Sequence, residues 1–122
     1  MQRPVLAIDN IHPAIQKFVA TNRQQLVTEV QAAIAAHSVV VVGMGMNPMC
    51  GKARKALDAA GAAHHYLEYG NYFNTWRDRN ALKIWTGWPT FPMVFVRGTL
   101  VGGASDVEKL IASGELKTML MA

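Results

Sequence analysis

The residue in this sequence best suited to chemistry is Cys50, the single cysteine of the chain. It follows Pro48 by two places and is followed by Gly51 and a run with helical spacing. At the first turn of a helix the backbone N–H groups lack partners and the helix dipole is positive, and both favour a thiolate. Lys52 adds positive charge nearby. We therefore predict that the pKa of Cys50 lies below about 8.5, the usual value of a free thiol.

Local spacing alone does not decide between a reactive and a structural cysteine. Free cysteines are among the most buried residue types and most are inert, so Cys50 also fits a packed core position. The neighbouring Met44, Met46 and Met49 are soft sulfur ligands that suit Cu(I), although we favour their packing into gaps of a loop. A presented Cys50 needs an external thiol or a metal as its partner, because the chain has no second cysteine.

The elements that position Cys50 follow from the hydrophobic pattern. Residues 38–43, SVVVVG, consist mainly of valine, which is typical of a strand buried on both faces. Ser105, with Glu108 three places on, forms a Ser-x-x-Glu pattern that predicts the cap of a last helix. The other expected elements are a helix from Pro13, a helix through Leu26 to Ile34, a helix over 51–60, a strand over 64–69, a helix over 73–85 and a hairpin over 92–103.

This order of elements predicts an α/β fold with a mixed sheet and helices on both faces. Strands that alternate with helices imply parallel pairing, and the hairpin adds antiparallel pairing. Cys50 then comes shortly after the carboxyl end of the strand 38–43. Open α/β sheets form their sites at this edge, so the predicted topology favours a site around the thiol.

Length and composition limit the classes of function. The chain has 122 residues, 51% of them hydrophobic, which suits one compact domain with a sizeable core. Its net charge is +4 without a basic stripe interleaved with aromatics, so we expect no nucleic-acid partner. One cysteine excludes a disulfide-stapled secreted domain. We find no signal peptide and no apolar run near the ~20 residues of a membrane span, and expect a cytoplasmic protein without a membrane partner.

Three motifs resemble those of the monothiol glutaredoxins, a family with a thioredoxin-like fold. That family carries C-G-F-S at its active site, W-P-T-x-P before the hairpin and G-G-C-D at the start of the next helix. The resemblance covers roughly residues 38 to 120. The matching residues here are Pro48, Cys50 and Gly51 for the first motif, Trp88, Pro89, Thr90 and Pro92 for the second, and Gly102 and Gly103 for the third.

The resemblance implies a thioredoxin-like fold whose central mixed four-stranded sheet is flanked by helices. Residues 38–122 would form the glutaredoxin-like domain and residues 1–37 an N-terminal helical extension. The resemblance also implies a cis Phe91–Pro92 bond and a glutathione site beside Cys50. The residues expected to bind glutathione are Thr90, Phe91 and Pro92 for its cysteinyl part, Arg79 for one carboxylate, and Gly103, Ala104 and Ser105 at a helix start for the other.

The chain departs from the family pattern at the site itself. C-G-F-S is CGKA here, with Lys52 and Ala53, and G-G-C-D is GGAS, which moves the acid to Asp106. Val42 stands where the family has a lysine that contacts glutathione. Such a charge-assisted contact is worth about 1.5–3 kcal/mol. Lys52 is the candidate replacement for that lysine.

Three functions follow from these motifs. The first is glutathione-dependent binding and transfer of a [2Fe–2S] cluster: two subunits would each supply Cys50 and two glutathiones the remaining thiolates, forming a cluster-bridged homodimer that serves iron–sulfur acceptor proteins. The second is a glutathione-dependent thiol–disulfide oxidoreductase that works through a mixed disulfide at Cys50. The third is a redox-inactive binding module of the same fold. The one-cysteine C-G motif ranks the first function highest.

Overall fold

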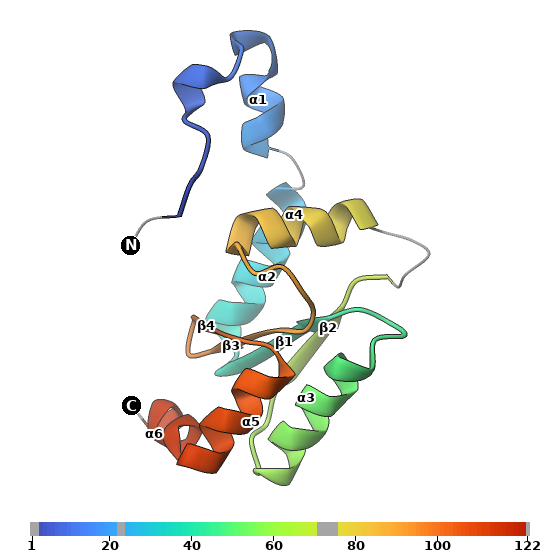
Figure 1. Ribbon diagram of the computed structural model, residues 1–122, viewed down its shortest axis with the longest axis vertical. Helices are drawn as coiled ribbons and strands as arrows, with labels where there is room; N and C mark the ends of the chain where they lie inside the picture. Colours follow the sequence, from blue (N-terminus) through green and yellow to red (C-terminus); the bar gives the residue numbers. More distant parts are fainter. Residues whose placement is uncertain (1–2, 22–23, 71–75, 122) are drawn as a thin grey trace.

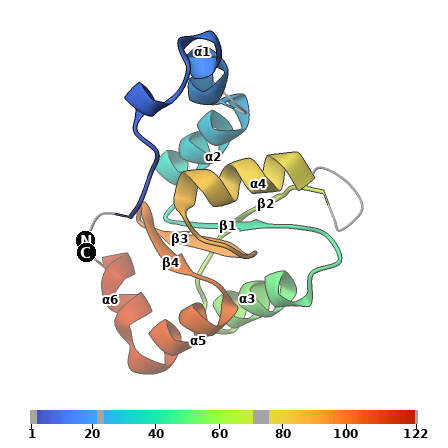
Figure 2. The same cartoon turned by 45° about the horizontal axis from the view of Figure 1, so that its top comes forward.

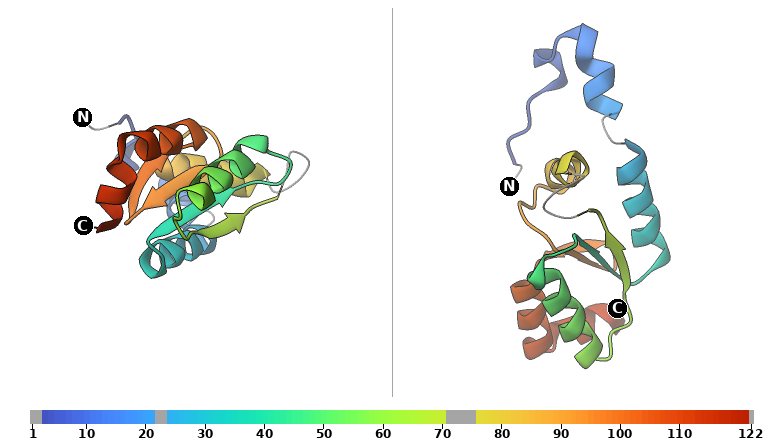
Figure 3. Two further views of the ribbon diagram at one scale, coloured as in Figure 1. Left: turned by 90° about the horizontal axis from the view of Figure 1, so that it is seen from below. Right: turned by 90° about the vertical axis from the view of Figure 1, so that its right-hand side faces the viewer.

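The computed structural model describes residues 3–21, 24–70 and 76–121, in which a four-stranded sheet lies between two layers of helices (Figure 1). Helices α2 and α4 cover one face of the sheet, and α3 and α5 cover the other (Figures 1 and 3). The predicted mixed sheet with helices on both faces is therefore confirmed. The elements in chain order are η1 (Ile8–Asn10), α1 (Pro13–Thr21), α2 (Gln24–Ala36), β1 (Val39–Gly43), α3 (Pro48–Ala59), β2 (His65–Glu68), α4 (Trp76–Thr86), β3 (Met93–Val96), β4 (Thr99–Gly102), α5 (Ala104–Ser113) and α6 (Glu115–Met121).

Strand β1 is an inner strand of the sheet, whose order is β2-β1-β3-β4. It pairs in parallel with β2 and antiparallel with β3, and β3 pairs antiparallel with β4. Every residue of β1 is buried, as expected for a valine-rich strand with helices on both faces. The parallel register pairs Gly43 with Glu68 at the carboxyl ends of β1 and β2. From the carboxyl end of β1 the chain continues through a short loop to α3, which contains Cys50.

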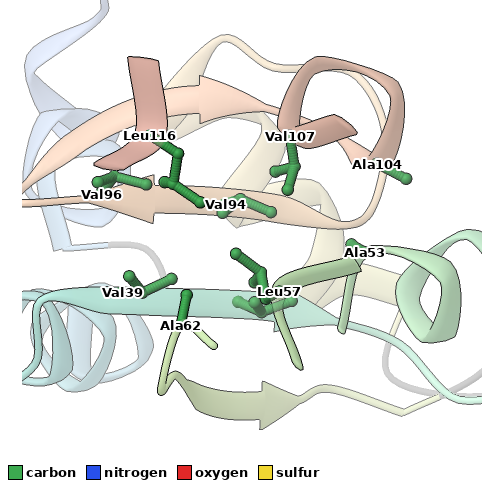
Figure 4. Close-up of a cluster of buried hydrophobic side chains, with 10 residues drawn as sticks. Val39, Ala53, Leu57, Ala62, Val94, Val96, Ala104, Val107 and Leu116 are labelled. Carbon is green, nitrogen blue, oxygen red and sulfur yellow. The ribbon is translucent and has the colours of Figure 1, made fainter. Parts of the chain in front are cut away.

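Two hydrophobic cores hold the sheet between its helices, because successive side chains of a strand point to opposite faces. Burying one valine or leucine side chain stabilises a fold by about 1.5–3 kcal/mol. The core toward α3, α5 and α6, drawn in Figure 4, contains Val39, Val41, Ala53, Leu57, Ala62, Val94, Val96, Ala104, Val107 and Leu116. The core on the α2 and α4 side contains Val30, Val40, Val42, Met44, Cys50, Leu82, Phe91, Met93 and Phe95.

The N-terminal region divides into a packed helix and an outlying one. Val30 of α2 is fully buried with Val40 and Val42, so α2 is part of the core. Helix α1 lies apart from the sheet (Figure 2). Arg3 connects the segment before α1 to the C-terminal end of α4, where its Nη2 donates to the carbonyls of Ile84 at 3.1 Å and Trp85 at 3.3 Å.

Most predicted elements lie where the sequence pattern put them, with shifted ends. Helix α3 begins at Pro48 instead of residue 51 because the Asn47 side chain caps it. Helix α4 is described from Trp76, and residues 73–75 of its predicted span lie outside the described residues. The C-terminal segment forms a short separate helix, α6, after the left-handed Gly114. None of the helices within the described ranges has the length and apolar content that a membrane crossing requires.

Candidate functional site

Cys50 occupies the third position of helix α3, close to the end of β1. Asn47 is the N-cap, and its Oδ1 accepts the Met49 backbone N–H at 2.9 Å. Pro48 fills the first helical position, where a missing N–H costs no hydrogen bond. These two residues explain why the helix starts early enough to include the thiol in its first turn. The predicted placement of Cys50 at a helix start is confirmed.

The prediction of a lowered pKa for Cys50 is wrong. The residue is only 2% exposed, and this burial raises the pKa of its thiol because the charged form loses solvation. A hydrogen bond from the Met44 backbone acts in the opposite direction, and the negative charge of Glu68 raises the pKa further. The sequence correctly predicted the helix start, which favours a lower pKa, but desolvation of the thiol has the larger effect and raises the pKa.

The sulfur of Cys50 lies over Gly43, opposite the aromatic ring of Tyr66. A Cβ built on Gly43 would be 2.9 Å from Cys50 Sγ and 2.9 Å from the Tyr66 hydroxyl oxygen. The hydroxyl donates to Glu68 Oε1 at 2.9 Å, and the Arg54 guanidinium lies 4.1 Å above the Tyr66 ring centroid. Only a residue without a side chain fits at position 43 in this arrangement. Strand β2 therefore contributes Tyr66 and Glu68 to the surroundings of the thiol.

A cleft of about 580 Å³ opens beside the start of α3 and receives most of the residues predicted to bind glutathione. Thr90, Phe91 and Pro92 come from the segment before β3, and Gly103, Ala104 and Ser105 come from the start of α5. Segments far apart in the sequence therefore meet there. The other lining residues are Met44, Asn47, Pro48, Met49, Lys83, Trp88 and Asp106.

The segment before β3 has the backbone geometry that the sequence resemblance implied. The Phe91–Pro92 peptide bond is cis, which confirms that prediction. The Phe91 carbonyl accepts a hydrogen bond from Asn47 Nδ2 at 3.4 Å. Asn47 therefore contacts both sides of the cleft: it caps α3 with its oxygen and reaches the opposite segment with its nitrogen.

The start of α5 differs from the predicted cap. Gly103, not Ser105, is the N-cap, and Asp106 Oδ2 accepts the Gly103 backbone N–H at 2.9 Å. Ser105 lies inside the first turn, so the predicted pairing of Ser105 with Glu108 is wrong. Asp106, which lies one place later than the acid of the family motif, thus caps the first turn of α5. A carboxylate there is also favourable because the helix N-terminus is positive.

Three cationic side chains near the start of α3 and on α4 lie in different places relative to the cleft. Lys52 contacts Glu108 at 3.4 Å and is not among the residues that line the cleft. Arg79 is 7% exposed, donates to the Tyr69 carbonyl at 3.3 Å and is likewise not among the lining residues. Lys83 lines the cleft, with its Nζ 5.8 Å from the Phe91 ring centroid.

Sequence reasoning missed Lys83, although a signal was present. Lys83 lies four residues after Arg79 on α4, and side chains four apart share one face of a helix. Once Arg79 had been selected, that spacing pointed to Lys83 as a second cation on the same side. In the described ranges, no group of three or more histidine, cysteine, aspartate or glutamate side chains is placed to hold a metal ion.

Comparison with known proteins identifies relatives of this chain. The family model described as Glutaredoxin matches residues 39–101. A "Glutaredoxin-like protein" from Dictyostelium discoideum is 43% identical over 102 residues, covering 84% of this chain and 83% of that protein. "Monothiol glutaredoxin-4" from Schizosaccharomyces pombe is 37% identical over 90 residues, but the match covers 70% of this chain and only 36% of that longer protein.

Solved structures share the fold. The crystal structure of oxidized glutaredoxin 2 from Chlamydomonas reinhardtii has a TM-score of 0.69 at 28% identity, covering 81% of this chain and 94% of that one. The buckwheat glutaredoxin–glutathione complex also has a TM-score of 0.69, at 26% identity, covering 80% of this chain and 89% of that one. These matches confirm the predicted thioredoxin-like fold.

Proposed function

The chain belongs to the glutaredoxin family, and from that premise we propose that it binds glutathione in the cleft beside Cys50 and uses both thiols to hold a [2Fe–2S] cluster. The observation that carries this proposal is the meeting of Cys50's helix start with Thr90, Phe91 and the N-terminus of α5 around one cleft. One structural neighbour, the buckwheat glutaredoxin, is a complex with glutathione. The relatives include a monothiol glutaredoxin.

The thiols available in this chain fit a cluster that is shared between two subunits, and they are too few for a cluster held by one subunit. A [2Fe–2S] centre takes four thiolates, and the chain has only Cys50. A second subunit would supply another Cys50, and two glutathione molecules the remaining thiolates. Metal coordination deprotonates a thiol outright, so the neutral resting state of Cys50 is compatible with this role. The cluster would be delivered to iron–sulfur acceptor proteins.

The cleft also suggests how glutathione is held. A tripeptide with two carboxylates needs cationic or N–H partners at both ends. Lys83 lies in the cleft as a cation, and the first turn of α5 presents the backbone N–H groups of Ala104 and Ser105. We propose that these groups bind the carboxylates while Thr90 and Phe91 hold the cysteinyl part near Cys50. Arg79, which the sequence motif suggested for one carboxylate, is buried on α4 and donates to the Tyr69 carbonyl. Lys52 pairs with Glu108, and neither cation is among the residues that line the cleft.

One observation bears on the alternative of a thiol–disulfide oxidoreductase. Disulfide exchange requires an accessible sulfur that attacks as a thiolate, whereas Cys50 is 2% exposed. In the resting state an incoming mixed disulfide does not reach the sulfur without movement of the surrounding side chains. The same side chains would have to move before iron could reach the sulfur, so the burial of Cys50 bears equally on cluster binding and on disulfide exchange.

An anaerobic reconstitution tests the proposal. The protein is supplied with iron, sulfide and glutathione, and its visible spectrum and molecular mass are recorded. We expect a coloured dimer that is lost in Cys50→Ser and lost when glutathione is omitted. The variant Lys52→Ala is the matched control, because Lys52 pairs with Glu108 outside the cleft, and it should retain the cluster.

Two other results would contradict the cluster function and identify its replacement. A colourless monomer that reduces glutathione mixed disulfides through Cys50 would assign the oxidoreductase activity. A protein that binds glutathione without colour or turnover would be the binding module.

A further inference from the structure

The half-buried ring of Tyr66 lies beside the buried sulfur of Cys50. A Cβ built on Gly43 would lie 2.9 Å from Cys50 Sγ, from Tyr66 Cε1 and from the Tyr66 hydroxyl oxygen, so the outer end of the ring and the sulfur are neighbours. Cluster binding and disulfide exchange both require a reactant to touch the sulfur. A neighbouring side chain therefore has to move before Cys50 takes part in either.

Two contacts at the surface hold the Tyr66 ring in its place. The hydroxyl donates to Glu68 Oε1 at 2.9 Å, and burial together with this bond raises the pKa of Tyr66, so the donor stays protonated at neutral pH. The Arg54 guanidinium lies 4.1 Å from the ring centroid. Both partners are exposed to solvent, where one hydrogen bond or one cation–π contact contributes little. The contacts that hold the ring are therefore easily broken.

The other groups around the sulfur are fixed more firmly than Tyr66. Gly43 ends β1, an inner strand that is paired on both sides, and Cys50 itself is part of the first turn of α3. Tyr66 belongs to β2, the edge strand of the sheet, and part of its ring already faces solvent. Rotation about its side-chain torsions moves the ring outward without breaking a backbone hydrogen bond of the sheet.

We propose that Tyr66 is a gating residue for Cys50: its ring covers the sulfur while its hydroxyl is bound to Glu68, and rotation of the ring away from Gly43 opens the sulfur to a reactant. Arg54 and Glu68 stabilise the closed position. The inference goes beyond the proposed function, because it concerns access to the thiol whichever reactant the thiol meets. It also gives Gly43 a role, since the missing side chain leaves the room in which the ring closes.

The rate at which Cys50 is alkylated measures this gate. When opening and closing are fast, the observed rate is reduced by the fraction of molecules that are open. Tyr66→Phe keeps the ring and removes the bond to Glu68, and loss of one hydrogen bond shifts such an equilibrium by about two- to tenfold. We expect iodoacetamide to label this variant faster by that factor at the high-pH plateau, where all of the thiol is ionised. Arg54→Gln should also raise the plateau rate.

Tyr69→Phe is the matched control for Tyr66→Phe. The Tyr69 hydroxyl donates to Glu29 Oε1 at 2.6 Å, so this variant loses a bond of the same type that does not involve the Tyr66 ring. Its plateau rate should equal that of the unmodified protein. An equal acceleration in Tyr66→Phe and Tyr69→Phe would refute the gate, because general loosening of the fold would then account for both.

The pH profile and urea unfolding distinguish gating from two other effects. The midpoint of the profile reports the pKa of Cys50, whereas the plateau reports access to the sulfur. A Tyr66→Phe variant that shifts the midpoint and leaves the plateau unchanged would refute the gate, because Tyr66 would then act on ionisation alone. A plateau rate that rises only in proportion to the unfolded fraction measured in urea would refute it as well.

The labelling experiment uses neither iron nor glutathione, so its result is independent of the proposed function. If Tyr66→Phe raises the plateau rate and no form of the protein assembles a cluster, the gate is supported and the proposed cluster function fails. If the cluster assembles and the plateau rate of Tyr66→Phe is unchanged, the proposed function stands and the gate is refuted. If both hold, Tyr66→Phe should also acquire the colour of the cluster faster than the unmodified protein.

Discussion

The sulfur of Cys50 and the hydroxyl of Tyr66 approach the same point above Gly43, where a Cβ would lie 2.9 Å from each of the two atoms. The thiol is therefore placed by a strand end and an edge strand as well as by its own helix. The first residues of α3, Pro48 and Met49, line the cleft, whereas Cys50 lies buried behind them and is not among the lining residues. Gly43 leaves the space in which the sulfur and the phenol meet.

Gly43→Ala should destabilise the protein, because the added methyl group collides with Cys50 Sγ and the Tyr66 ring. Overpacking of this kind costs about 1–3 kcal/mol in the free energy of unfolding. Gly51→Ala is the matched control: a Cβ there meets nothing within 4 Å, and alanine is favoured over glycine in a helix by up to about 1 kcal/mol. Urea unfolding measures both, and equal stabilities for the two variants would contradict the arrangement around Gly43.

The rate of Cys50 alkylation should depend on pH with a midpoint above that of the same thiol in the urea-unfolded chain. Burial raises the pKa of Cys50, and only the thiolate reacts, so the reaction is slow at neutral pH and accelerates as pH rises through the raised pKa. Iodoacetamide kinetics measure the midpoint. Glu68→Gln should lower it, because the Glu68 charge raises the pKa, while Glu115→Gln on α6 should leave it unchanged. A midpoint below that of the unfolded chain would restore the prediction of an activated thiol.

Lys83→Ala should weaken glutathione binding, whereas Lys52→Ala should not. Lys83 lines the cleft, and Lys52 pairs with Glu108 outside it. Removing a charged hydrogen-bond partner at a partly exposed site is expected to weaken binding by about tenfold, and the effect should shrink at high salt because exposed charges are screened. Calorimetric titration at two salt concentrations checks this. A larger loss in Lys52→Ala would return the role of carboxylate partner to Lys52.

Arg3→Gln should loosen the C-terminal end of α4. The Arg3 guanidinium donates to the Ile84 and Trp85 carbonyls, and a cation at a helix C-terminus contributes about 0.3–1 kcal/mol. We expect a loss at the lower end of that range, because the contact is exposed, and faster amide exchange at Gly87, whose N–H donates to the Lys83 carbonyl. Arg3→Lys, which keeps the charge, should recover part of the protection. Unchanged exchange in Arg3→Gln would show that the N-terminal segment does not support α4.

The fold was predictable because its signals are local. The valine run of 38–43, the helical pattern of 51–60 and the hairpin pattern of 92–103 each depend on a few neighbouring residues, and together they predict a mixed sheet with helices on both faces. Helix ends were less predictable, since they depend on which side chain reaches the first free N–H groups. Asn47 and Asp106 take that role in α3 and α5, where the pattern had suggested a later start and Ser105.

The sequence by itself determined that one cysteine begins a helix after a buried strand, and its W-P-T-x-P and G-G motifs determined the family. The tertiary structure decided the burial and the raised pKa of that cysteine, and it decided which cation lines the cleft. Desolvation depends on atoms that the fold brings together from distant parts of the chain, such as Gly43, Tyr66 and Glu68 around the sulfur. For the same reason Lys83 lies in the cleft and Lys52, only two residues from Cys50, does not.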